Sequence, residues 1–90
     1  MRQPYPWVDR AGRILDLENL LDREDLEPAT ELAVREQLEA LMDPDIDEKT
    51  AEKRWRRVRE LAPGLWENSG AQSVATSLMT EALKRALGLI

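Results

Sequence analysis

The 90-residue sequence contains no cysteine and no histidine. Without cysteine, neither a disulfide framework nor a thiolate metal site can form. Without histidine, the chain lacks the commonest general base, the commonest metal ligand and the side chain that titrates near neutral pH. We therefore expect a protein that is not an enzyme and that uses no cofactor and no metal ion.

Phenylalanine is also absent, so the aromatic part of the core must come from tryptophan. The expected packing anchors are Trp7, Trp55 and Trp66. Ninety residues form one small domain, close to the size at which a single core is only marginally sufficient. Because many of the apolar residues are alanine, the core is thin, and a thin core favours self-association.

Long uncharged apolar runs are missing as well. The C-terminal segment comes nearest to such a run, but Glu81, Lys84 and Arg85 interrupt it. The sequence does not open with the basic segment and apolar stretch that are typical of a signal peptide. A membrane-spanning helix needs about 18 or more apolar residues, so we expect a soluble cytoplasmic protein without a membrane partner.

Charged residues, in contrast, are abundant and unevenly distributed. The chain has a net charge of −5. Residues 16–48 hold thirteen acidic residues and two arginines, a net charge of −11. Residues 49–60 hold six basic and two acidic residues, a net charge of +4. An acidic half therefore accompanies a basic helix within one small domain.

Residues 1–15 are predicted to form an extended arm or a β-hairpin. Pro4 and Pro6 lack amide donors and disfavour helix in the residues before them. Short apolar runs flank Asp9-x-x-Gly12, where the glycine can adopt a positive φ. The alternative is an irregular arm that runs into a first helix. A hairpin is marginal by itself, so we expect the arm to pack on the helical domain.

Residues 16–90 are predicted to form an all-α domain, a small bundle of one short and three longer helices. Asp16 can cap the short helix, and Asp25 can cap the second helix with Pro28 in its first turn. The third helix, at about residues 47–62, repeats its apolar residues at spacings of four, three and four. These residues are Ala51, Trp55, Val58 and Ala62.

Three aspartates precede the third helix. Asp43, Asp45 and Asp47 alternate as the ligands at the start of a calcium-binding loop do. However, Glu48 stands where such a loop needs glycine, and Arg54 stands where it needs a bidentate glutamate. We therefore expect an aspartate to cap the helix, with no metal site.

The last helix is predicted as one continuous element from Ser69 to Ile90. Pro63-Gly64 ahead of it indicates a type II turn. Ser69 can cap the first turn of the helix, and Gly88 can adopt the left-handed conformation that ends it. Apolar residues fill about half of the circumference, so the helix needs cover from more than one neighbour.

Alanines repeat on this last helix at spacings of four, seven and four, which lets another helix approach closely. Only two other substantial helices are available. We therefore expect the chain to cover one side and a second copy, in a two-fold dimer, to cover the other. The predicted interaction residues are Ala71, Ala75, Leu78, Met79, Ala82, Leu83 and Ala86.

A basic stripe lies on the third helix, opposite the face that contains Trp55. It consists of Lys49, Lys53, Arg56 and Arg57. Such a stripe can contact a phosphate backbone. The alternative is that these cations face the acidic residues of 25–48, in the same chain or in a partner copy. Exposed pairs of that kind contribute mainly to orientation and partner choice.

Two functional hypotheses follow. The first is a non-enzymatic helical protein–protein interaction module, a homodimer, that assembles or regulates a larger complex. The second is a nucleic-acid-related protein: either residues 49–59 bind DNA or RNA, or the acidic half imitates a nucleic acid and inhibits a basic partner. Residues 28–90 hold a charged helix, a short acidic break, a second charged helix that ends in Leu-Ala-Pro and an alanine-rich helix that ends in Leu-Gly-Leu. This order resembles that of small helical accessory modules in bacteria and archaea, which implies no particular activity.

Overall fold

The computed structural model describes the backbone of residues 6–90 and the side chains of residues 10–90. This part of the chain is helical and contains no strand, which confirms the predicted all-α class. None of its helices is both long and apolar enough to cross a membrane. In chain order the helices are α1 (Pro6–Leu21), α2 (Pro28–Ala40), α3 (Glu48–Leu61), α4 (Pro63–Glu67), α5 (Ser69–Ser77) and α6 (Glu81–Ala86).

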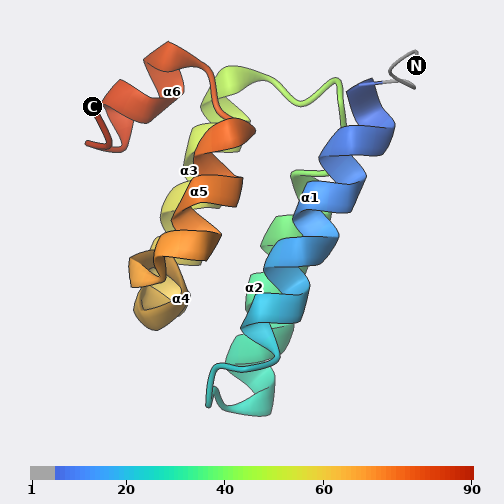
Figure 1. Ribbon diagram of the computed structural model, residues 1–90, viewed down its shortest axis with the longest axis vertical. Coiled ribbons are helices and arrows are strands. Elements are labelled where there is room, and N and C mark those ends of the chain that lie inside the picture. Colours follow the sequence, from blue (N-terminus) through green and yellow to red (C-terminus); the bar gives the residue numbers. More distant parts are fainter. Residues whose placement is uncertain (1–5) are drawn as a thin grey trace.

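The four longest helices form two adjacent pairs. Figure 1 shows α1 in front of α2 on one side of the view and α5 in front of α3 on the other. The most extensive contacts join α2 to α3 and α1 to α5. The short α4 connects α3 to α5 at one end of the bundle, and α6 packs on α3 near the other end. The bundle measures 39 × 28 × 22 Å.

The core lies between these pairs. Trp55, on α3, is 1 % exposed, and its ring centroid is 6.2 Å from that of Trp66, on α4. Leucine and alanine account for most of the remaining core. Three groups of buried residues belong to the same cluster as the tryptophans: Ile14, Leu17 and Leu21 of α1, Val34 and Leu38 of α2 with Leu41 after it, and Ala71 and Ala75 of α5.

The predicted hairpin at residues 7–15 is wrong, because these residues lie inside α1. Pro6 starts the helix, where its missing amide leaves no intrahelical bond unmade. Tertiary contacts then hold the N-terminal half of α1. Ile14 is fully buried, and Arg10 Nη1 donates to the Leu41 carbonyl beyond the end of α2, at 3.1 Å. The part of the predicted arm at 1–5 and the Trp7 side chain lie outside the described residues.

α1 crosses the boundary at residue 15 that the sequence predicted, and it is the longest helix in residues 6–90 rather than a short one. α2 begins at Pro28, and the residue at its N-cap position is Glu27, not Asp25. α3 agrees with the predicted span of 47–62, although the Asp47 side chain makes no capping hydrogen bond. Instead of a type II turn, Pro63 and Gly64 form the first turn of α4.

The predicted continuous helix at 69–90 is interrupted. Asn68, not Ser69, caps α5, since its side chain accepts a hydrogen bond from the Ala71 amide at 3.1 Å. The helix ends at Ser77, and Thr80 starts α6 by accepting from the Leu83 amide at 3.1 Å. Threonine is a favoured N-cap residue, so Thr80 stabilises the start of α6 after the break.

The predicted end of the last helix is confirmed. Gly88 has a φ of 75°, and the Leu89 amide donates to the Lys84 carbonyl at 2.8 Å. The Gly88 amide donates to the Arg85 carbonyl, which completes a Schellman motif. Leu87 is buried and Leu89 packs against the core, so this motif returns the chain to the bundle.

Thr80→Ala should lower the free energy of unfolding by about 1 kcal/mol, because the variant loses the N-cap of α6. The Thr80 hydroxyl also donates to Glu48 of α3, so the same change loosens the contact between the two helices. Urea denaturation followed by circular dichroism measures the difference. Thr76→Ala is the control, since Thr76 Oγ1 donates only to the Ser73 carbonyl of its own helix. Equal losses in both variants would contradict the capping role.

Candidate interaction surface on α3

Helix α3 has two faces of opposite character. One face is buried in the core through Ala51, Trp55 and Val58. The opposite face carries the predicted basic stripe. Lys49, Lys53 and Arg57 are exposed there, and Arg56 is half-buried. The four predicted stripe residues therefore lie on one helix, but Arg56 is less exposed than the other three.

Arg56 is engaged within the fold. Its Nη2 donates to the Ala86 carbonyl at 2.7 Å, and its Nε lies 3.0 Å from a carboxylate oxygen of Glu52. Arg59 Nη1 donates to the Leu87 carbonyl at 2.9 Å. Both arginines thus bind carbonyls at the C-terminal end of α6, where the helix dipole favours positive charge. Arg56 therefore helps to hold α6 against α3. It is not free to bind an external ligand, as the predicted stripe required.

Lys49, Lys53 and Arg57 form a row along the outer face of α3, because they recur every four residues. At 1.5 Å per residue the row is about 12 Å long. Within residues 10–90, Lys49 and Lys53 form no ion pair. Arg57 lies 3.4 Å from Glu60, but both side chains are more than half exposed, so this pair contributes little. Most of the positive charge of the row is therefore not neutralised within the described part of the chain, so an external anion can bind it.

Arg54 is the residue that the sequence analysis missed. It is half-buried beside α2, and its Nη1 donates to Gln37 Oε1 at 3.0 Å. Its Nε is buried and has no hydrogen-bond partner. The sequence shows the charge of Arg54, but only the packing of α2 on α3 determines that one of its donors is left without an acceptor. We call Lys49, Lys53, Arg54 and Arg57 together the basic face of α3.

Two shallow depressions lie on this face. Lys53 and Arg54 line both of them. The first depression, of about 350 Å³, is completed by Gln37, Arg56, Arg57 and Glu60. The second, of about 410 Å³, is completed by Lys49 and Thr50. The two depressions share Lys53 and Arg54, so they lie next to one another on α3, and we call them together the trough.

The acidic residues of 25–48 do not neutralise this face. In the described part of the chain, no ion pair joins them to α3. Arg35 of α2 instead binds Glu18 at 3.0 Å and also contacts Asp22, which ties α2 to α1. The acidic half is thus partly neutralised by its own arginine, while the basic face of α3 is left without those acids.

The predicted alanine seam is divided between two helices. Ala71, Ala75, Met79 and Leu83 are buried by the rest of the chain, and Leu78 is half-buried. Only Ala82 and Ala86, both on α6, are exposed. Because the chain is interrupted between α5 and α6, the four alanines do not lie along one straight helix. The chain itself therefore covers most of the predicted apolar arc, and Ala82 and Ala86 are left uncovered.

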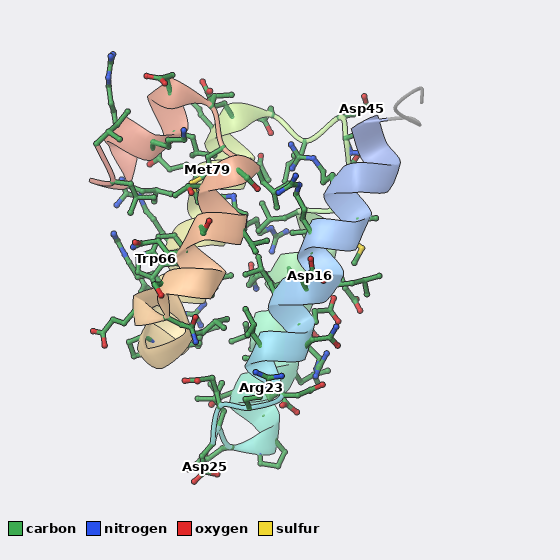
Figure 2. All side chains as sticks on the ribbon, viewed as in Figure 1. Asp16, Arg23, Asp25, Asp45, Trp66 and Met79 are labelled. Carbon is green, nitrogen blue, oxygen red and sulfur yellow. The ribbon has the colours of Figure 1, made fainter. Side chains whose placement is uncertain are left out.

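The three aspartates before α3 form a local turn. Asp43 Oδ1 accepts a hydrogen bond from the Asp45 amide at 2.9 Å, the pattern of an Asx turn. Asp47 occupies the N-cap position of α3 in an extended backbone conformation. Figure 2 shows Asp45 in the connection before α3, at the end of the bundle opposite Asp25.

The chemistry that α3 offers is anion binding. Lysine supplies a compact positive charge, and arginine supplies a planar fork that matches a carboxylate or a phosphate. No family model, curated protein or solved structure matches this chain. The function is therefore inferred from the residues of the basic face themselves.

Proposed function

We propose that this chain is a non-catalytic cytoplasmic helical module that binds another protein through the basic face of α3. The observation that carries the proposal is that Lys49 and Lys53 have no ion pair in residues 10–90, although residues 16–48 of the same chain have a net charge of −11. A surface of one sign on a protein of the other sign steers association with an oppositely charged partner. Assembly or regulation of a larger complex would follow from such binding.

A homodimer stays a prediction. The buried members of the predicted seam cannot meet a second copy while the chain is folded, which leaves Ala82 and Ala86 as its accessible part. A dimer through these two residues would need a face of α6 to pair with itself around a two-fold axis. Light scattering at tens of micromolar protein would give twice the mass of one chain.

Nucleic-acid binding is the second candidate, because the same row of cations can contact phosphates. The row is about 12 Å long, and a strand of duplex DNA advances 3.4 Å per phosphate along the helix axis, so the row faces only about three or four phosphates. Mimicry of a nucleic acid by the acidic half is the opposite form of this candidate. Mimicry would require a basic partner that binds the acidic half and does not contact α3.

Lys53→Glu/Arg57→Glu should abolish capture of the partner from an extract of the source cells. Each substitution reverses a charge on the basic face, so we expect at least a tenfold loss of captured protein, about 1.4 kcal/mol or more. The immobilised wild-type chain is the reference, and captured proteins are quantified by mass spectrometry with and without nuclease. Nuclease should not change the capture.

Arg23→Glu/Arg85→Glu is the matched control, since it changes the net charge equally at exposed positions outside α3. Figure 2 shows Arg23 at the turn between α1 and α2. The control should capture the partner as the wild type does. Equal loss in both double variants would contradict binding through α3. Loss of capture after nuclease would favour nucleic acid, and release of the captured protein by added DNA would favour mimicry.

A further inference from the structure

We infer that the basic face of α3 docks an acidic α-helix whose carboxylates recur every four residues, with Arg54 as the central anchor. The inference rests on the proposed function and gives the chemistry of its partner. Three observations carry it: the unpaired donor of Arg54, the spacing of the row that flanks it, and the length of that row.

Arg54 is a cation without an anion. It donates to the neutral Gln37 amide oxygen, while its Nε is buried without a partner, and no carboxylate in residues 10–90 pairs with it. A partly buried guanidinium with an unpaired donor is costly, because burial removes its water and nothing replaces it. A carboxylate that enters the trough can accept two parallel hydrogen bonds from such a group. Reaching Nε requires a rotamer change of Arg54, which is common at interfaces.

The row of Lys49, Lys53 and Arg57 sets the spacing of the partner's charges. Residues four apart on a helix lie about 6 Å apart along its axis. A second helix that lies alongside α3 has the same repeat, so carboxylates at its positions i, i+4 and i+8 can each approach one member of the row. Arg54 then meets the central carboxylate, because it adjoins Lys53 and lines both depressions of the trough.

A helical partner fits this face better than an extended peptide does. An extended peptide binds most strongly by adding to the edge of a sheet, where its amides and carbonyls find partners. Residues 6–90 contain no strand, so this chain offers no such edge in its described part. A helix satisfies its own backbone and presents only side chains, which are what the trough contacts.

The length of the row favours a short acidic segment over a nucleic acid. The row covers about 12 Å, whereas tight phosphate-backbone binding engages about six to ten phosphates. A duplex that continued beyond the row would meet a protein of net charge −5. Three carboxylates spaced four residues apart on a helix also span about 12 Å, so such a segment matches the row from end to end.

The test compares two capped alanine-based helical peptides of equal composition, each with three glutamates. One has the glutamates at i, i+4 and i+8, and the other has them at i, i+5 and i+10, which spreads them around the helix. Isothermal titration calorimetry with the full chain at low salt should show at least fivefold tighter binding of the aligned peptide. Arg54→Gln should weaken that binding about tenfold, and Arg54→Lys nearly as much, because lysine lacks the planar fork.

Two controls separate binding from folding. Arg23→Gln makes the same charge change at an exposed turn and should alter the Kd less than twofold. Thr76→Ala removes a hydrogen bond on α5, away from the residues that line the trough, and should also alter the Kd less than twofold. Circular dichroism of each variant confirms that the helices are intact.

Equal affinity for the two peptides, or equal effects of Arg54→Gln and Arg23→Gln, would overturn the inference. Tighter binding of a 20-base-pair DNA duplex than of the aligned peptide at the same salt would overturn it in favour of nucleic acid. If neither peptide binds but a protein is still captured from extract through Lys53 and Arg57, the acidic helix is the wrong partner and the proposed function stands. If both experiments fail, the proposed function fails as well.

Discussion

Trp55→Ala should lower the free energy of unfolding by about 3–5 kcal/mol, because removing a buried tryptophan loses its transfer free energy and leaves a cavity. A domain of this size has a total stability of about 5–13 kcal/mol, so much of the chain would unfold at moderate temperature. The effect is expected to be this large because Trp55 is 1 % exposed and contacts the second buried indole, Trp66. Urea and thermal denaturation followed by circular dichroism measure it.

Trp55→Phe distinguishes loss of volume from loss of a hydrogen bond. The Trp55 Nε1 is buried without a hydrogen-bond partner, so replacing the indole with a phenyl ring sacrifices no polar contact. We expect less than half the loss that alanine causes. Leu32→Ala is the surface control, since Leu32 is 60 % exposed and should change stability by less than about 0.5 kcal/mol. A loss at Leu32 as large as that at Trp55 would contradict the assigned core.

Ala75→Leu should lower the free energy of unfolding by about 1–3 kcal/mol or more, because added methylenes in a packed core force neighbouring side chains to shift. Ala75 is 2 % exposed on α5, which packs against α1 and α4. The change barely alters helix propensity, so the loss reports packing alone. Denaturation in urea, with the slope checked for two-state behaviour, gives the value.

Ala82→Leu is the matched substitution on the exposed part of the predicted seam, and it should leave stability nearly unchanged. Ala82→Arg tests the predicted homodimer at the same position. If copies meet through α6, the arginine reduces the mass in solution to that of one chain. A stable protein after Ala75→Leu, with a changed mass, would show that α5 faces a second copy and not its own core.

One helix supplies both the core and the proposed binding surface. The inward residues of α3 anchor the bundle through Trp55, and its outward residues carry the basic face. This arrangement holds the cations on a rigid element, so little conformational entropy opposes binding. It also explains why Arg56 and Arg59 differ in role from Lys53, since the two arginines lie where α6 ends against α3.

Several features followed from the sequence because their causes are local. The all-α class and the span of α3 depend on the repeat of apolar residues, which needs no knowledge of neighbouring helices. The end at Gly88 depends on the freedom of glycine to adopt a positive φ. The charge of the outer face of α3 is likewise a property of residues four apart on one helix.

Only the tertiary structure decided the rest. Residues 7–15 are helical because Ile14 and Arg10 find partners elsewhere in the bundle, and no local pattern reports such partners. The last helix breaks before Thr80, which allows Leu83 and Leu87 to be buried while the C-terminal carbonyls of α6 meet α3. Packing also determines that Arg54, and not Arg56, belongs to the basic face, because Arg56 binds the end of α6. Long-range packing determines which donors are used inside the fold and which one is left without an acceptor.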